Sequence, residues 1–286
     1  KGFTITNAEI EVEVDINSTI IKSDNIVHEK GNLAGSLTFP RKHINSPVFL
    51  SYQLDGQYPL NDARTIFGES FERTVEDINA TTLFCNATGE ILNKQPDTNS
   101  NSNFKLDVQS IDPFTIKGFE INKIYGSVYK SGHLTTGNFP SIKIADGQGQ
   151  LYFETEANGT EEFVNLNFSL KEANKGRLIK NIIRAKEAGI FSKFKKEQSE
   201  IDLEKETFAD EGSLSFAIQA EGPLNNPLQF EGTGTIHLRE SKISQINLLG
   251  KISEGLSNLK IPLPSGAFSF NELLIPFELN NESIIF

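Results

Sequence analysis

The fold is indicated most clearly by residues 212–241, which read GSLSFAIQAEGPLNNPLQFEGTGTIHLRES. In the first half of this stretch, apolar side chains occupy every second position. A period of two is typical of a β-strand with one buried face. The segment Leu224–Pro227 (LNNP) predicts a turn, because asparagine and proline favour turns, and the alternation then resumes. The apolar positions of the two predicted strands are Leu214, Phe216, Ile218 and Ala220, then Phe230, Gly232, Gly234, Ile236 and Leu238.

Residues 242–286 predict a helix and then another strand. Between Ile246 and Leu259, apolar side chains recur at spacings of three and four, which predicts an amphipathic helix. Ser241 is a suitable N-cap, and Pro262 ends the segment. Strand alternation then returns, with one break near Asn271. Its apolar positions are Phe268, Phe270, Leu273, Ile275, Phe277 and Leu279.

The chain before residue 171 also consists of short alternating segments joined by turns. Asp146-Gly147 and Asn158-Gly159 are the strongest hairpin signals. Closely spaced strands predict an antiparallel meander rather than a βαβ protein. We therefore predict a mostly β fold, a long curved antiparallel sheet or groove shaped like a taco, with two amphipathic helices. A β-sandwich is the alternative, because two packed sheets require the same alternation. The predicted strands include 3–21, 31–40, 48–54, 83–89, 104–108, 114–121, 124–129, 132–136, 148–155 and 163–170.

Residues 171–196 (KEANKGRLIKNIIRAKEAGIFSKFKK) predict the other amphipathic helix and interrupt the strands. The segment holds nine lysines and arginines against two glutamates, and the acidic stretch 197–211 follows it. Two interpretations stay open. The helix caps the sheet, with its charges in solvent or paired to the acidic stretch, or it lies on an anionic membrane surface, as basic amphipathic helices can. For membrane contact the candidates are Lys180, Arg184, Phe191 and Phe194.

Composition limits the class of protein. The net charge of −11 argues against a nucleic-acid-binding protein, which needs a basic surface. No segment approaches the roughly 18–20 consecutive apolar residues of a membrane-spanning helix. The chain has 22 phenylalanines, 5 tyrosines and no tryptophan. Because phenylalanine lacks a polar group, many of these rings are expected to be buried or to face an apolar partner.

The sequence contains no recognisable catalytic, metal-binding or cofactor-binding motif. The four histidines lie in separate segments, away from cysteine or acids at metal-ligand spacing. Cys85 lies on the apolar side of a predicted strand without an identified histidine partner, which favours a buried thiol over a nucleophile. The row of acids at Glu9, Glu11, Glu13 and Asp15 could bind a cation, but the solvent-facing side of a strand explains it more simply. We predict no enzyme, no cofactor and no metal.

The C-terminal elements carry a resemblance to a known family. A GPLNNPL turn at residue 222, a GTGTIHL strand, a helix and an FSFNELL strand resemble the C-terminal region of AsmA-like proteins. The resemblance is best over 212–286 and weaker over 114–170, with 171–196 as a helical insertion in a single domain, residues 1–286. It implies a bacterial periplasmic protein, anchored in the inner membrane by an N-terminal segment, whose β-groove shields lipid acyl chains on the way to the outer membrane.

The leading functional prediction is a non-enzymatic envelope protein that shields or transfers lipid acyl chains in an apolar β-groove and supports outer-membrane assembly. Its expected partners are phospholipid or another lipid and a membrane surface, not nucleic acid. The alternative is a structural or adhesive β-sandwich that acts through surface loops such as 95–103. A glycan-active enzyme is a weaker third hypothesis, since 38 acids supply carboxylate pairs by chance. The groove-lining candidates are Leu214, Phe216, Ile218, Phe230, Ile236, Leu238, Phe268, Phe270, Ile275 and Phe277.

Overall fold

A computed structural model describes residues 4–28, 31–41, 46–58, 78–79, 83–93, 102–110, 112–116, 118–158, 161–187, 212–224, 226, 229–242, 269–280 and 283–286. Fifteen strands in these ranges form one large sheet, three form a small sheet, and one segment is helical. The helix predicted between Ile246 and Leu259 lies outside the described residues, as do Phe191, Phe194 and Phe268.

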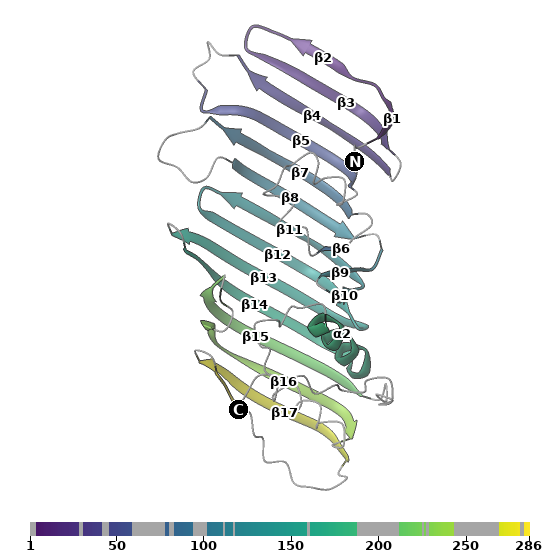
Figure 1. Ribbon diagram of the computed structural model, residues 1–286, viewed down its shortest axis with the longest axis vertical. Coiled ribbons are helices and arrows are strands. Elements are labelled where there is room, and N and C mark those ends of the chain that lie inside the picture. The colour runs from purple at the N-terminus through teal and green to yellow at the C-terminus, as the bar shows by residue number, and fades with distance from the viewer. Residues whose placement is uncertain are drawn as a thin grey trace.

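The large sheet is an antiparallel meander that follows the chain from one end to the other (Figure 1). Its path of fourteen strands spans roughly 60 Å at a spacing of about 4.8 Å, and β2 also pairs with β3. The sheet is open and not closed on itself, so the predicted long antiparallel sheet is confirmed. The strands are β1 (Ile5–Ala8), β2 (Glu11–Val14), β3 (Ser18–His28), β4 (Gly31–Pro40), β5 (Val48–Tyr58), β7 (Leu83–Leu92), β8 (Ser102–Ser110), β11 (Lys123–Ser131), β12 (Leu134–Ile144), β13 (Gly147–Asn158), β14 (Glu161–Asn174), β15 (Ser213–Pro223), β16 (Glu231–Lys242), β17 (Ser269–Asn280) and β18 (Ser283–Ile285).

The hairpin between β12 and β13 turns at Ala145 and Asp146, one residue earlier than the sequence predicts. Ile144 pairs with Gly147, and the two residues between them have positive φ angles of 48° and 66°. Positive φ at both central positions is the signature of a type I′ turn, whose twist matches that of the paired strands. The required twist of the hairpin therefore outweighs the usual preference for glycine at these positions.

Residues 114–121 form a hairpin and not the single strand that the alternation predicts. β9 (Phe114–Ile116) pairs with β10 (Phe119–Ile121), and β6 (Ile78–Asn79) pairs with β9 to complete the small sheet. The chain reverses around Gly118, whose φ of 79° is a conformation that glycine adopts without steric cost. One strand and two short strands have the same alternation, so periodicity could not distinguish them.

The basic segment starts as a strand and becomes helical four residues later than predicted. β14 continues to Asn174, and helix α2 is Lys175–Glu187; residues 188–196 lie outside the described ranges. Asn174 acts as the N-cap, because its Oδ1 accepts a hydrogen bond of 2.9 Å from the backbone N–H of Arg177. The prediction of a helix over 171–196 was therefore wrong at its start, where pairing with β15 extends the strand.

The acidic N-terminal row lies at an edge of the large sheet. Lys22 on β3 places its Nζ 3.2 Å from a carboxylate oxygen of Glu11 and 2.6 Å from one of Glu13. The lysine thus occupies the place at which a cation would bind. Hydrogen bonds first to Glu13 and then to Glu11 raise the pKa of Lys22. On the other side of β2, Val12 and Val14 are 56% and 63% exposed, so this edge strand is not half-buried.

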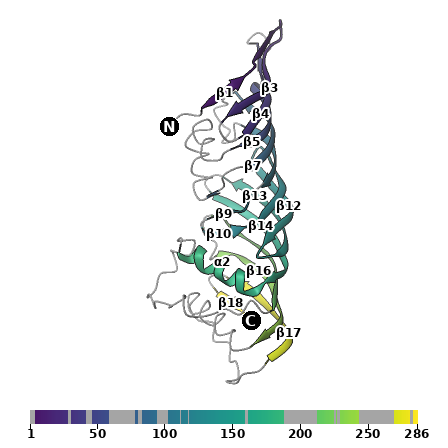
Figure 2. The same cartoon turned by 90° about the vertical axis from the view of Figure 1, so that its right-hand side faces the viewer.

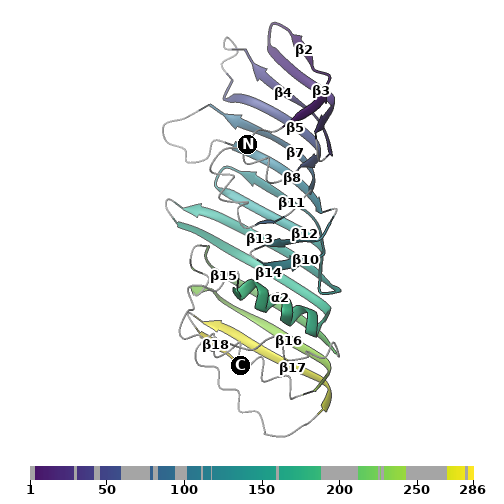
Figure 3. The ribbon, with the colours of Figure 1, turned by 45° about the vertical axis from the view of Figure 1, so that its right-hand side comes forward.

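The two faces of the large sheet differ. Seen edge-on, α2, β9 and β10 all lie on one side of it (Figure 2). We call this side the apolar face and the opposite side the polar face. The oblique view shows α2 crossing in front of β14, with β10 beside it (Figure 3). The helix and the small sheet together are called the plug, because they cover the middle of the apolar face.

Candidate functional site

The apolar face is built from cross-strand pairs that stay in phase over most of the sheet. One row of directly paired residues crosses twelve consecutive strands, from β4 to β18, and every residue in it is apolar or glycine. Side chains on one face of paired strands contact one another, so the row forms a continuous apolar surface. The row is Gly35, Leu54, Ala87, Leu106, Val128, Gly137, Phe153, Leu166, Ala220, Gly232, Leu279 and Ile284.

Seven of the ten predicted lining residues lie together on this face. In the register of β15, β16 and β17, Phe216 pairs with Ile236, which pairs with Ile275. The sequence prediction of a shared face is therefore confirmed for this part of the sheet, although their contact with a ligand stays a prediction. The seven residues are Leu214, Phe216, Ile218, Ile236, Leu238, Ile275 and Phe277.

The other three predicted lining residues do not belong to this group of seven. Phe230 precedes β16 and its ring packs against Gly222 of β15. Phe270 is paired with Ser241 in the register, and its side chain lies outside the description. Phe268 is outside the described residues altogether.

Glycines on the apolar face lie beneath aromatic rings of the neighbouring strand. Gly137 pairs with Phe153, and Gly234 pairs with Phe277. A Cβ atom added to either glycine would collide with the ring opposite. The absence of a side chain lets each ring lie flat across the neighbouring backbone, an arrangement that also shields glycine in a sheet from water. Gly137 of β12 and Gly234 of β16 therefore have a packing role.

Phenylalanine rings form a row across the C-terminal strands. The ring centroids of Phe168 and Phe216 are 6.2 Å apart, those of Phe216 and Phe277 are 5.8 Å apart and stacked, and Phe286 lies 6.2 Å from Phe277. These separations are within the range of favourable aromatic pairs. The phenylalanine-rich composition is thus concentrated here on one surface.

A hollow of about 710 Å³ adjoins this aromatic row. Most of its lining residues belong to the polar face of β14 to β18, among them Gln219, Thr233 and Glu278. Only Ile218, Gly234, Phe277 and Phe286 of its lining belong to the apolar face. The volume is in the range of about 300–1,000 Å³ that small-molecule sites have.

The plug buries the middle of the apolar face. Leu178 and Ile182 of α2, with Phe114 and Ile121 of the small sheet, pack against residues of β12 and β14 in one core cluster. Within this cluster Ile142 and Leu170 are each only 3% exposed. Most apolar residues farther along the sheet in both directions are half-buried. The tightest packing is therefore at the plug.

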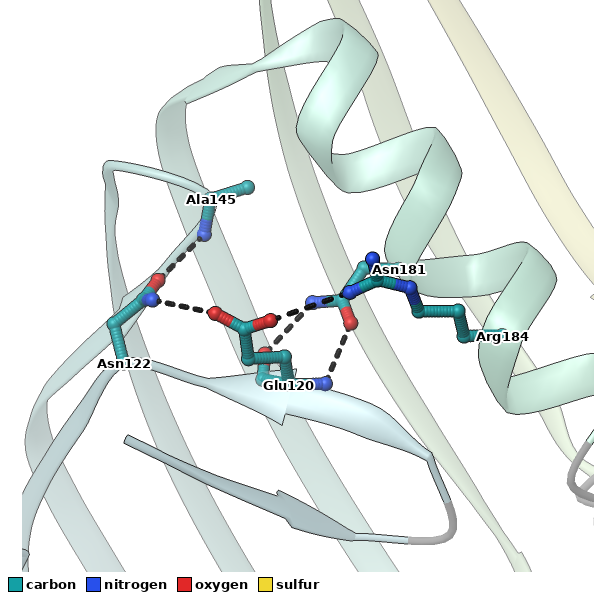
Figure 4. Close-up of polar contacts among 5 residues, drawn as sticks. All are labelled: Glu120, Asn122, Ala145, Asn181 and Arg184. Atoms are coloured by element: carbon teal, nitrogen blue, oxygen red, sulfur yellow. Dashed lines mark hydrogen bonds and ion pairs between the residues drawn. The ribbon is translucent and has the colours of Figure 1, made fainter. Parts of the chain in front are cut away.

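A pair of hydrogen bonds joins the two parts of the plug (Figure 4). Asn181 of α2 accepts a bond of 2.5 Å at Oδ1 from the backbone N–H of Glu120, and its Nδ2 donates one of 2.7 Å to the Glu120 carbonyl. The side-chain amide thus completes the pairing of a β10 peptide as another strand would. Asn181 is 5% exposed. A polar residue on the apolar side of the predicted helix was the only signal of this contact in the sequence.

The side chain of Glu120 links the plug to its surroundings. Its Oε1 accepts a bond of 3.0 Å from Asn122, whose Oδ1 in turn accepts one of 3.1 Å from the N–H of Ala145 (Figure 4). Its Oε2 lies 3.5 Å from a guanidinium nitrogen of Arg184. A second ion pair, of 2.8 Å, joins Arg177 to Asp146. Of the two described membrane-contact candidates, Arg184 is thus paired within the plug, and Lys180 is exposed.

The shifted pKa values of Cys85 and Glu272 bear on whether either side chain could take part in a reaction. Cys85 lies on the apolar face, and burial raises the pKa of its thiol to about 12. The thiol is therefore protonated at neutral pH and is a poor nucleophile. On the polar face, His237 Nε2 lies 2.5 Å from Glu272 Oε1, and His237 first, then Arg239, lower the pKa of Glu272. His237 thus contacts Glu272 and is only partly exposed.

In the part of the chain that the structure describes, no group of three or more histidine, cysteine or acidic side chains is arranged to hold a metal ion. In the same residues, no helix is long and apolar enough to span a bilayer. Comparison of the chain with protein-family models, with curated proteins and with solved structures gives no match. The two faces of the large sheet are therefore the features of this chain that bear on its function.

We expect Asn181→Ala to loosen the plug. The substitution leaves the N–H and C=O of Glu120 without their partners, and an unsatisfied buried polar group costs about 1–3 kcal/mol. The free energy of unfolding in urea, followed by circular dichroism, should fall by about this amount. Lys180→Ala, one residue away and exposed, is the control and should stay within about 0.5 kcal/mol of the parent. Equal stability of the two variants would contradict the role of the Asn181 contact.

Gly234→Ala tests the glycine–aromatic pairs. The new Cβ would collide with the Phe277 ring, and overpacking of this kind costs about 1–3 kcal/mol. A thermal unfolding curve should shift to lower temperature. Thr235→Ala, the next and exposed position, is the control. If the collision is the cause, Phe277→Leu should destabilise the Gly234→Ala protein less than it destabilises the parent. If the effects of the two substitutions simply add, the collision is not the cause.

Cys85 should be nearly inert in the folded protein. With its pKa raised to about 12, its thiolate fraction at pH 8 is about a thousandfold lower than that of an ordinary thiol. We expect the rate of labelling by a disulfide reagent to be lower by at least that factor than in denaturant. Labelling at the rate of a free thiol would show that water reaches the apolar face at β7.

Proposed function

We propose that the chain binds lipid by laying acyl chains against the apolar face of its long sheet. The observation that carries this proposal is the row of twelve apolar or glycine residues from Gly35 to Ile284, paired across consecutive strands without a polar interruption. Apolar area gains roughly 25 cal/mol per Å² when it is removed from water. A long apolar surface of this kind favours a long apolar ligand.

The form of the surface supports an acyl chain over a compact ligand. The sheet path spans roughly 60 Å, about twice the hydrocarbon thickness of a bilayer. Rings that lie flat over glycines, such as Phe153 over Gly137, reduce the relief of the face. A flexible hydrocarbon chain can follow such a surface, and it needs no hydrogen-bonding partners. Binding is then passive shielding, with no bond made or broken.

The proposal extends to the setting that the AsmA-like resemblance implies. The protein would act in the bacterial periplasm, attached to the inner membrane, and would shield or transfer phospholipid or another lipid for outer-membrane assembly. The exposed cation of Lys180 on α2, on the same side as the apolar face, is suited to an anionic membrane surface. Arg184 would contribute if its pair with Glu120 opened.

The test combines native mass spectrometry with site-specific crosslinking. After gentle purification and after incubation with phosphatidylglycerol–phosphatidylethanolamine vesicles, we expect adducts with the mass of phospholipid. A photoreactive amino acid at position 236, on the apolar face, should label lipid. The same amino acid at position 235 is the matched control, because Thr235 neighbours Ile236 on β16 and points to the polar face.

Two results would overturn the proposal. One is a protein that carries no phospholipid and takes up none from vesicles. The other is equal lipid labelling from positions 235 and 236, which would mean adsorption without use of the apolar face. Either outcome would favour a structural or adhesive role through the surface of the sheet.

A further inference from the structure

The polar face has a hollow of its own at the N-terminal half of the sheet. It measures about 460 Å³ and extends over β4, β5, β7, β8 and β11. Helix α2 and the small sheet lie on the opposite side of the large sheet, so no described element covers this side (Figure 2). Nothing in the lipid proposal uses it.

Two adjacent rows of paired residues make the floor of the hollow. The first consists of Ser36, Gln53, Thr88, Lys105 and Tyr129, one from each of the five strands. At about 4.8 Å per strand this row is roughly 20 Å long. Ser36 lies at one end and Thr88 in the middle, and the exposed ring of Tyr129 lies at the other end. The hollow is therefore an elongated trough and not a compact pocket.

The second row is equally polar, with Thr38, Ser51, Glu90 and Asn103. Among the described residues, only Asn103 of this row has a side-chain partner, since its Oδ1 accepts a bond of 3.1 Å from Gly132 N–H. Its NH₂ group makes no contact with another described residue. Glu90 is the sole acid and Lys105 the sole base among the lining residues, and the ammonium group of Lys105 is paired with Asp107 beside the hollow. The lining thus carries one charge of each sign and has no excess of positive charge.

The side chains of the trough are largely without partners in the described chain. Gln53, Thr88 and Tyr129 make no side-chain hydrogen bond with another described residue. The next row across the same strands is different: Asn86 donates to Asp55 at 3.1 Å, and Asp107 pairs with Lys105 at 2.8 Å. Apart from the ammonium group of Lys105, which Asp107 engages, the side-chain donors and acceptors of the first row make no polar contact within the described chain and are available to a ligand.

These features select one class of ligand. The main-chain groups of the five strands are used in the ladders, so a peptide cannot bind here by adding a strand. A near-neutral lining does not attract nucleic acid or another polyanion. The floor is too polar for an acyl chain. What remains is a neutral, hydroxyl-rich, elongated molecule.

We propose that the trough binds a neutral oligosaccharide. Hydroxyl and amide side chains of the two rows exchange hydrogen bonds with sugar hydroxyls, directly or through water. The Tyr129 ring, 51% exposed, packs against the C–H groups on one face of a sugar ring, which buries apolar surface on both. The site lies on the face opposite to the apolar face and does not depend on lipid binding.

The test uses maltohexaose, cellohexaose and chitohexaose as probes of the whole chain, by isothermal titration and saturation-transfer NMR. We expect at least one to bind, and Tyr129→Ala and Gln53→Ala each to raise its Kd about tenfold, the scale of one lost ring or hydrogen-bond contact. Tyr125→Ala is the matched control. Tyr125 lies on the same strand and face and is 53% exposed, but it is outside the trough.

Each other outcome overturns the proposal. If none of the three probes binds at millimolar concentration, the proposed site is ruled out. An equal loss in the Tyr125 and Tyr129 variants places binding outside the trough. Binding of heparin alone, weakened by salt, would mean attraction of a polyanion instead. Unfolding curves of all three variants should match that of the parent, since each residue is exposed; a variant that unfolds early is replaced by Tyr129→Phe, which keeps the ring and should retain binding.

Discussion

The structure depends on the pleat of one antiparallel sheet. Successive side chains point to opposite faces, and paired residues share a face, so a slip of one residue in any register would move a whole strand's apolar set to the other side. The pairs that join Phe216, Ile236 and Ile275 keep the C-terminal strands in phase. The same phase reaches back to Gly35 on β4. Two faces of opposite chemistry follow from this single constraint.

An apolar face this long is costly in water, and the fold covers its middle with the plug. The position of α2 is set by the apolar contacts of Leu178 and by the pairing of Asn181 with the Glu120 peptide. Because a buried amide without partners would be strongly unfavourable, the plug is specific in position as well as apolar. Away from it, the glycine–aromatic pairs make the face smoother and still leave it partly open, as an acyl chain would require.

Some side chains of the polar face bond to one another, and others make no side-chain contact with another described residue. Asn86 donates to Asp55, and Asp107 engages Lys105 of the adjoining row, whereas Gln53 and Thr88 in that adjoining row have no such partner among the described residues. Hydrogen bonds within a face rigidify it, and unpaired groups leave it able to recognise a ligand. Since the two proposed sites lie on opposite faces of a single sheet, either can hold if the other fails.

The sequence by itself determined the strand-and-turn character, the antiparallel order and the shared face of residues such as Leu214, Ile236 and Phe277, because alternation is a local property of the chain. It did not determine where the chain leaves the large sheet. Phe114–Ile121 alternates like a strand but folds back over the apolar face, and the basic segment begins as β14. Only the tertiary structure decided these points, and also the contact of Asn181 and the neighbours of Thr88. The physical reason is that each depends on pairing between residues far apart in sequence, whose free energy is gained only when the whole register has formed.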